Sequence, residues 1–271
     1  MAAQNKGTAL ITGASSGIGA VYADRLARRG YDLIIVARNR NRLDALARRL
    51  TNETKRSVEV LAADLNSKAD LSRVEDTLKK DSSITMLVNN AGIGTFAPLL
   101  DSDANKMEEM ISLNIIALTR LTYAAAPGFV ARETGTIINI SSIVGIAPEM
   151  LNGVYGGSKA YVLAFSHSLQ HELAAKCIRI QAVLPGATAT EFWDVGGMPV
   201  SNLPSEIVMT TENLVDAALS GLDQGELVTI PALADKGEWD RYEAARRDMS
   251  TRLSRTEPAA RYGIKTLAKA S

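Results

Sequence analysis

Thr8-Ala-Leu-Ile-Thr-Gly-Ala-Ser-Ser-Gly-Ile-Gly19 is the stretch from which the architecture of this chain follows. Its first residues, Thr8 to Ile11, form a short apolar run, which is typical of a buried parallel strand. Three glycines follow, and after them an apolar stretch, AVYADRLARR, that is compatible with a helix ending near Gly30. A strand, a glycine-rich turn and a helix make the first half of a dinucleotide-binding unit. In such a unit the backbone approaches a pyrophosphate at the helix N-terminus.

The spacing of these glycines leaves an alternative open. Gly-x-x-x-Gly-x-Gly differs from the more common Gly-x-Gly-x-x-Gly, and small residues also suit an ordinary turn between a strand and a helix. The position of the turn directly after a strand favours the nucleotide interpretation.

Beyond this unit, apolar strands and amphipathic helices alternate, which indicates βαβ units and a parallel sheet. We expect strands at 8–12, 32–37, 58–63, 84–89, 135–141, 178–184 and 226–230. We expect helices at 18–29, 40–51, 67–80, 104–126, 153–175 and 211–223. Because no repeat or low-complexity linker interrupts the pattern, we expect one α/β domain over residues 1–234.

Composition restricts the possible partners. The 271 residues carry 30 basic and 30 acidic side chains, so no net charge favours a nucleic acid or an anionic membrane. The single cysteine, Cys177, excludes an intrachain disulfide, and its place before an apolar strand predicts a buried, inert thiol. We find no apolar run of transmembrane length and no signal core, and we therefore expect a cytoplasmic protein.

Two residues one helical turn apart suggest acid–base chemistry. Tyr155 and Lys159 are spaced so that their side chains meet on one face of a helix. A neighbouring cation favours the phenolate, and lowering the Tyr155 pKa from near 10 to about 7 requires roughly 4 kcal/mol. Such a tyrosine exchanges a proton at neutral pH. Ser142 follows a predicted strand, where its hydroxyl can donate to a substrate oxygen. Ser141 is the second candidate, and strand alternation points it the other way.

Six motifs occur in one order along the chain. They are Thr12-Gly-Ala-Ser-Ser-Gly-Ile-Gly19, Asn89-Asn-Ala-Gly92, Asn114, Ser142, Tyr155-x-x-x-Lys159 and Pro185-Gly186. The set resembles the short-chain dehydrogenase/reductase family in its compact form, over residues 6 to about 232. The resemblance implies a single Rossmann-like, doubly wound parallel sheet of order 3-2-1-4-5-6-7, flanked by helices. It also implies a nicotinamide-dependent oxidoreductase that acts on a small molecule and assembles as a homodimer or homotetramer.

The resemblance also implies roles for the candidate residues. Tyr155 is then the general acid in reduction and the general base in oxidation. Ser142 holds the substrate oxygen, and Lys159 additionally binds the nicotinamide ribose. Asn114 holds a water that links Lys159 to solvent; the alternative is an asparagine that only satisfies helix packing.

The same resemblance predicts the cofactor site. Asp64 meets the adenine, Asn90 and the backbone after it line the adenosine, and Thr188 and Thr190 clasp the nicotinamide carboxamide. The implied contacts are Gly13, Ser15, Ser16, Gly17, Ile18, Gly19, Arg38, Asp64, Leu65, Asn90, Ala91, Gly92, Tyr155, Lys159, Pro185, Gly186, Thr188 and Thr190.

The end of the second strand predicts the choice of cofactor. NAD preference usually needs an acidic side chain there, and this chain has Ala37. Arg38 follows, and a guanidinium suits a 2′-phosphate. We therefore expect NADP rather than NAD. Ser15 stands where some NADP users carry a second basic residue, which predicts a moderate preference. The other arginines of the cluster, Arg40 and Arg42, are interpreted as helix surface.

Two segments depart from the alternation. Residues 187–210 are rich in Gly, Pro and small polar residues, and we interpret them as a lid over the substrate; a surface loop is the alternative. An apolar pocket is expected from Phe192, Trp193, Val195 and Met198 of this lid, with Phe96, Met150 and Leu151. Residues 235–271 are expected to form a helical extension, with Trp239, Tyr242, Met249 and Leu253 on one stripe. We expect it to pack on the domain or on a neighbouring subunit.

The expected activity is an NADP-dependent carbonyl reductase or alcohol dehydrogenase with an apolar substrate. A 3-oxoacyl thioester reductase is the nearest alternative. A non-catalytic NADP-binding regulator is disfavoured because Ser142, Tyr155 and Lys159 are all present. A sugar-nucleotide epimerase would want a different glycine spacing and a larger C-terminal domain. His167 and His171 are four residues apart, but no third ligand is evident, so no metal site is expected.

Overall fold

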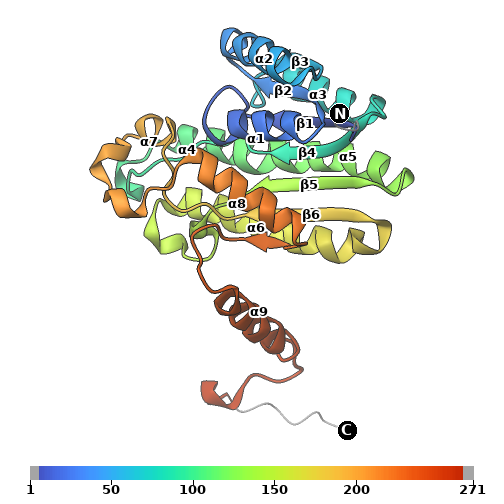
Figure 1. Cartoon of the computed structure of the whole chain (residues 1–271). Coiled ribbons are helices and arrows are strands. Elements are labelled where there is room, and N and C mark those ends of the chain that lie inside the picture. The colour runs from blue at the N-terminus through green and yellow to red at the C-terminus, as the bar shows by residue number, and fades with distance from the viewer. Residues whose placement is uncertain (1–5, 265–271) are drawn as a thin grey trace. The chain divides into compact units, whose positions relative to one another are not determined.

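The computed structural model describes residues 6–264, and the chain forms two compact units, residues 1–232 and 233–271. The first unit is built on a seven-stranded parallel sheet of order β3-β2-β1-β4-β5-β6-β7, which confirms the predicted topology (Figure 1). The strands are β1 (Thr8–Thr12), β2 (Asp32–Ala37), β3 (Val58–Ala62), β4 (Ile84–Asn89), β5 (Gly135–Ile140), β6 (Ile178–Val183) and β7 (Val228–Thr229).

Helices cover both faces of this sheet. They are α1 (Gly17–Arg28), α2 (Arg40–Thr54), α3 (Lys68–Lys80), α4 (Ala104–Ile111), α5 (Leu118–Ala131), α6 (Gly153–Leu173), α7 (Phe192–Val195) and α8 (Thr211–Asp223). Side chains of α1, α2 and α8 share one apolar core with the sheet, and those of α3, α5 and α6 share another. Each face is thus covered by its own helical layer, as in a doubly wound fold.

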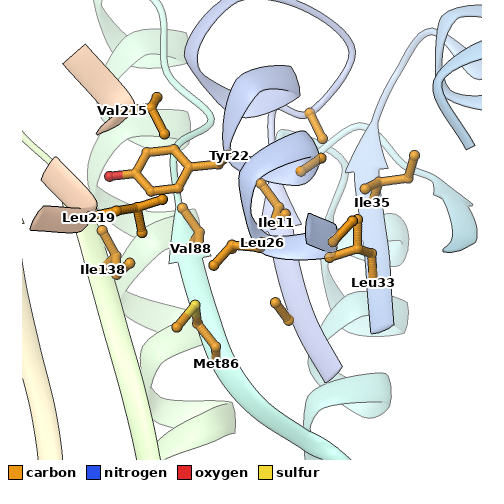
Figure 2. Close-up of a cluster of buried hydrophobic side chains, with 14 of the residues drawn as sticks. Ile11, Tyr22, Leu26, Leu33, Ile35, Met86, Val88, Ile138, Val215 and Leu219 are labelled. Carbon is orange, nitrogen blue, oxygen red and sulfur yellow. The ribbon is translucent and has the colours of Figure 1, made fainter. Parts of the chain in front are cut away.

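Strand alternation divides the apolar residues between the two cores. In β1, Ile11 points toward α1 and α8, while Leu10 points to the opposite core. Figure 2 shows the first core, in which the ring of Tyr22 lies beside Val215 and Leu219 of α8. Both faces of the central strands are therefore buried, which explains why their sequences are apolar throughout.

Polar side chains fix the starts of the helices that frame the site. Asn39 accepts a hydrogen bond from the backbone N–H of Arg42 at 3.1 Å, and Ser67 and Thr210 cap α3 and α8 in the same way. These caps satisfy backbone donors that an α-helix leaves free in its first turn.

The turn from β1 to α1 depends on its glycines. Gly13 has a φ of +66°, which favours glycine, and a Cβ placed there would lie 2.8 Å from Nδ2 of Asn90. A Cβ on Gly19 would overlap the carbonyl oxygen of Gly13. The glycine pattern thus lets the first turn of α1 pack against the end of β1.

The predicted helix 104–126 lies within a continuous helical stretch, Ala104–Ala131, that is not α-helical throughout. A π-helical turn, Ser112–Ala117, separates α4 from α5 and contains Asn114. The Asn114 side chain accepts from the backbone N–H of Ile93 at 3.0 Å and donates to the Ile93 carbonyl at 2.9 Å. These tertiary hydrogen bonds hold Asn114 at the widened turn, and π-turns of this kind often lie at functional sites.

Two other features bear on the sequence predictions. Cys177 is exposed, not buried; it lies at the turn before β6, with φ 59° in the left-handed region. The stretch Ala104–Ala131 is long and apolar enough to cross a membrane by composition alone, although no such run was expected. A helix in the core of a globular fold passes the same test, and Leu121 and Phe129 of this stretch pack in the second core.

The second unit contains α9 (Lys236–Ser250). Asp235 caps it by accepting from the Gly237 N–H at 2.8 Å, and the rings of Trp239 and Tyr242 lie 5.2 Å apart. Leu253 of the predicted stripe lies beyond the helix end. Residues 1–5 and 265–271, which the predicted domain and extension include, lie outside the described residues.

Candidate active site

A cleft of about 1160 Å³ follows the carboxyl ends of the strands in the first unit. Its lining comes from the segments that directly follow β1 to β6 and from the predicted lid. All of the predicted cofactor contacts except Gly19 line this cleft, and so do Ser142, Tyr155 and Lys159. This is the edge at which doubly wound sheets bind their ligands.

The start of α6 positions Tyr155. Asn152 caps this helix by accepting from the backbone N–H of Val154 at 2.9 Å. Its amide nitrogen donates to the carbonyl of Ala97 at 2.7 Å, which ties the helix to the loop after β4. One turn along α6, the ammonium of Lys159 donates to the carbonyl oxygen of Ile140 at 3.0 Å. Tyr155 and Lys159 are both buried.

Ser142 follows the last residue of β5, Ile140, by two positions. Its side chain is hydrogen-bonded to that of Tyr155. Ser141 is turned the other way, and its hydroxyl donates to the carbonyl of Lys159 at 2.7 Å. The alternation expected of a strand thus separates the two serines. Ser142 is the one that meets the tyrosine.

The protein itself keeps Tyr155 in its neutral form. Burial raises the pKa of Tyr155 to about 12, and the hydrogen bond with Ser142 opposes that rise. Burial also lowers the pKa of Lys159 to about 8. In the chain alone the pKa of Tyr155 thus moves away from neutrality, because loss of water outweighs the hydrogen bond with Ser142.

Asn114 lies behind the cleft rather than in its lining. Besides its two bonds to Ile93, its amide nitrogen donates to the hydroxyl of Ser158 at 3.1 Å. A Cβ on Gly92 would lie 3.1 Å from Oδ1 of Asn114 and 3.5 Å from Nζ of Lys159. Gly92, which has no side chain, therefore leaves room for the side chains of both Asn114 and Lys159.

The glycine turn fits a phosphate group. Ser16 precedes α1 and makes no side-chain cap, so the first N–H groups of the helix face the cleft without that partner. The amide nitrogen of Asn90 donates to the carbonyls of Thr12 and Gly13, at 2.9 and 3.2 Å. Asn90 thus holds the turn in shape, and the N-terminus of α1 provides favourable charge for an anion.

At the end of β2, Arg38 lines the cleft beside Ala37. Among residues 6–264, Arg38 takes part in no ion pair of the structure. Asp64 and Leu65 after β3 line the same region, and the Asp64 carboxylate accepts from the N–H of Asn66 at 3.0 Å. The position after β2 thus presents a guanidinium and no carboxylate, which suits a phosphate better than a ribose hydroxyl.

Four further charged residues line the cleft that the sequence did not assign to the site, namely Arg42, Glu109, Glu191 and Glu206. Arg42 forms an ion pair with Glu191 at 2.7 Å, between α2 and the start of the lid. The sequence signal for Arg42 is its place in the short basic cluster that begins at Arg38. Glu191 is distant in sequence and has none.

The predicted lid contains more structure than expected. It holds α7 and two 3₁₀ turns, Val200–Asn202 and Ser205–Ile207, and the segment is pinned where Thr188 pairs with Met209. The ring centres of Phe192 and Tyr155 lie 5.6 Å apart. The indole nitrogen of Trp193 donates to the Thr188 carbonyl at 2.8 Å.

The apolar residues of the predicted pocket are divided by the structure. Those that line the cleft are Met150, Leu151, Phe192, Trp193, Val195 and Met198. Phe96 is not part of the lining. Its ring instead stacks on Trp193, with centres 4.8 Å apart, and meets Phe192 edge-on at 6.1 Å. Phe96 thus supports the lid from behind.

Within residues 6–264, no group of three or more His, Cys, Asp or Glu side chains is placed to hold a metal ion. His167 and His171 both lie on α6.

Comparisons with known proteins identify relatives of this chain. The family profile described as short chain dehydrogenase matches residues 7–195. A solved short-chain dehydrogenase from Sphingobium yanoikuyae in complex with NADPH is 50% identical, with a TM-score of 0.92, and covers 94% of this chain and 99% of its own. The bulky-bulky ketone specific alcohol dehydrogenase from Comamonas testosteroni is 45% identical, with a TM-score of 0.88, and the coverage is 96% and 99%. The very-long-chain 3-oxoacyl-CoA reductase of Anas platyrhynchos is 35% identical over 216 residues, which are 78% of this chain and 67% of the relative.

Proposed function

Because this chain belongs to the short-chain dehydrogenase family, we propose that it is an NADP-dependent oxidoreductase that interconverts a ketone and a secondary alcohol. The observation that carries this proposal is the contact of Ser142 with Tyr155, with Lys159 one helical turn away, in a cleft that begins at the glycine turn. The nicotinamide of such a cofactor supplies or accepts the hydride when it is bound.

The residues of the chain supply the proton and the charge. Tyr155 is neutral and buried, so in reduction it donates its phenolic proton to the substrate oxygen. Ser142 donates a hydrogen bond to the same oxygen as charge develops there. The Lys159 ammonium stabilises the phenolate that remains. Its hydrogen bond to Ile140 fixes it near the tyrosine.

Two observations support NADP over NAD as the cofactor, and a third supports a nicotinamide cofactor of either kind. Arg38 directly follows β2, and the residue before it is Ala37 rather than an acidic residue. A guanidinium pairs well with a 2′-phosphate. The relative from Sphingobium yanoikuyae was solved in complex with NADPH. The cradle formed by Gly13, Ser16 and α1 fits the pyrophosphate that both nicotinamide cofactors share.

The lining of the cleft beyond Tyr155 supports an apolar substrate. Phe192, Trp193 and Met198 of the lid line the cleft together with Met150 and Leu151. A ketone with two large apolar substituents fits such a lining, and the Comamonas testosteroni relative is an alcohol dehydrogenase specific for bulky-bulky ketones. A 3-oxoacyl thioester reductase is the second candidate, and the likeness to the Anas platyrhynchos reductase favours it only weakly.

We also propose that the chain assembles as a homodimer or homotetramer. On α5 and α6, the exposed ring of Tyr123 stacks on Phe165, and Phe165 stacks on Tyr161. This aromatic surface supports an interface between copies. Light scattering of the purified protein measures the assembly, and a monomer would contradict it.

Binding and turnover test the proposed function. We expect NADPH to bind more tightly than NADH in a fluorescence titration, and NADPH to be oxidised with at least one bulky aryl or alkyl ketone. The panel also includes aldehydes and 3-oxoacyl thioesters. Turnover of thioesters alone would favour the second candidate. The absence of binding of either nucleotide would overturn the proposal.

A further inference from the structure

One carboxylate connects the lid to both elements that face the cofactor phosphates. Glu191, the residue before α7, is paired with Arg42 in the first turn of α2 at 2.7 Å. The Glu191 carboxylate is also hydrogen-bonded to the side chain of Ser16, at the N-terminus of α1. All three residues line the cleft.

The Glu191 carboxylate lies where the surrounding groups favour an anion. Ser16 belongs to the glycine turn, and the N-terminus of α1 favours negative charge. Arg42 lies four residues after Arg38, in the first turn of α2, and its backbone N–H donates to the side chain of the cap residue Asn39. The surroundings that suit a phosphate are thus filled by a carboxylate of the chain itself.

The ion pair between Arg42 and Glu191 is weak enough for another anion to replace the carboxylate. The Arg42 and Glu191 side chains are 48% and 57% exposed, and ion pairs between exposed groups contribute little to stability. The hydrogen bond from Arg42 lowers the pKa of Glu191 below its usual value. Glu191 is therefore charged at neutral pH. A phosphate dianion repels this carboxylate and binds a guanidinium more strongly than a single carboxylate does.

We propose that Arg42 is a second specificity-determining residue for the 2′-phosphate of NADP(H), and that Glu191 pairs with it until the phosphate replaces the carboxylate. The proposal rests on the proposed function, because it needs NADP(H) in the cleft. Its consequence is that a 2′-phosphate releases the start of the lid from α2. NADH lacks that phosphate and leaves the pair intact.

Binding of cofactor fragments tests the proposal without turnover. Calorimetric titrations with 2′,5′-ADP and with 5′-ADP compare the wild type, Arg42→Gln, Glu191→Gln and a control, Asp76→Asn. The control removes one carboxylate and one exposed ion pair, with Lys80 at 2.7 Å, outside the cleft.

For Arg42→Gln, we expect affinity for 2′,5′-ADP to fall by about tenfold, with affinity for 5′-ADP little changed. For Glu191→Gln, we expect affinity for 2′,5′-ADP to rise by up to about fivefold, because the competing carboxylate is gone. Arg42→Lys should restore part of the loss. Asp76→Asn should behave like the wild type.

A second readout follows the lid. Trp193 is one of two tryptophans in the chain, so Trp239→Phe leaves it as the sole indole emitter. In that background 2′,5′-ADP should change the Trp193 emission more than 5′-ADP does. Glu191→Gln should shift the unliganded emission toward that of the 2′,5′-ADP complex.

Three outcomes would overturn the inference. They are an unchanged affinity of Arg42→Gln for 2′,5′-ADP, a lower affinity of Glu191→Gln for 2′,5′-ADP, and a Trp193 emission that changes equally with 2′,5′-ADP and 5′-ADP. If Arg38→Asp weakens binding while Arg42→Gln does not, the proposed function stands and only this inference fails. If the wild type binds neither NADPH nor NADH, the proposed function itself fails.

Discussion

The ammonium of Lys159 lies 5.8 Å from the centre of the Tyr155 ring and donates its 3.0 Å hydrogen bond to the carbonyl of Ile140. The lysine is therefore held by the end of β5, beside the tyrosine. Ser142 is the residue that hydrogen-bonds Tyr155. Since burial dominates the pKa of Tyr155, the chain keeps the phenol protonated, which is the form needed to donate a proton to a carbonyl oxygen.

Removal of this phenol should separate chemistry from binding. In Tyr155→Phe we expect kcat/KM for ketone reduction to fall by about a thousandfold, because the general acid is lost. NADPH affinity should stay within about twofold, since the ring remains in place. Steady-state kinetics and nicotinamide fluorescence measure the two quantities.

A tyrosine outside the cleft provides the matched control. The hydroxyl of Tyr161 lies 2.8 Å from that of Thr119, on the surface of α6 away from the cleft lining. Tyr161→Phe should keep wild-type kinetics. An active Tyr155→Phe enzyme would remove the proposed general acid from the mechanism.

The buried Lys159 should make stability depend on pH in a defined direction. Its pKa is about 8 in the folded state and 10.5 when exposed, so between these values the unfolded chain binds more protons. The free energy of unfolding therefore rises with pH across this window, and the gain is lost as pH falls through about 8. From pH 7.5 to 9.5 we expect the wild type to gain about 2 kcal/mol relative to Lys159→Met.

Urea unfolding of both proteins at the two pH values measures this difference, and groups common to both cancel. Tyr155 works in the opposite sense at higher pH. Its pKa is about 12 in the folded state and 10.0 when exposed. Its contribution to the free energy of unfolding is therefore fully present below pH 10 and is lost as pH rises through 12. A wild type that gains nothing over Lys159→Met would show that Lys159 is solvated.

Cofactor choice should respond to the charge at the end of β2. Arg38→Asp replaces a guanidinium with a carboxylate that repels a 2′-phosphate and accepts from a ribose hydroxyl. We expect the ratio of NADPH to NADH affinity to fall by at least about tenfold. Titration of both nucleotides measures the ratio. Arg48→Asp makes the same charge change on α2 outside the cleft lining and should leave the ratio unaltered.

Local sequence was sufficient for the parts of the site that follow directly from strands. Gly13 and Ser142 each come just after an apolar run, and parallel strands bring those positions to one edge of the sheet. The Tyr155–Lys159 spacing predicted a shared helix, which α6 confirms.

Tertiary structure determined the rest. The pKa of Tyr155 depends on burial by segments distant in sequence. The π-turn at Asn114 depends on hydrogen bonds to Ile93, and Glu191 meets Arg42 across 149 positions. Cys177 was misplaced because its conformation comes from a turn and not from the strand that follows.

The close approach of the lid to Tyr155 should depend on Gly94. A Cβ at this position would overlap the ring of Phe192 and lie 3.2 Å from Cδ2 of Tyr155. Gly94→Ala should therefore displace Phe192, since overpacking of this kind costs about 1–3 kcal/mol. We expect kcat/KM for a bulky ketone to fall by about tenfold, with NADPH affinity unchanged.

Gly157 offers the same substitution without a neighbour to displace. A Cβ there meets nothing within 4 Å, so Gly157→Ala in α6 should keep the kinetics and raise stability by up to about 1 kcal/mol, through helix propensity. If Gly94→Ala also kept wild-type kinetics with bulky ketones, the contact of Phe192 with Tyr155 would not shape the substrate site. A loss confined to bulky ketones, with small ones unaffected, would place Phe192 against the larger substituent, because only that group needs the space the displaced ring would occupy.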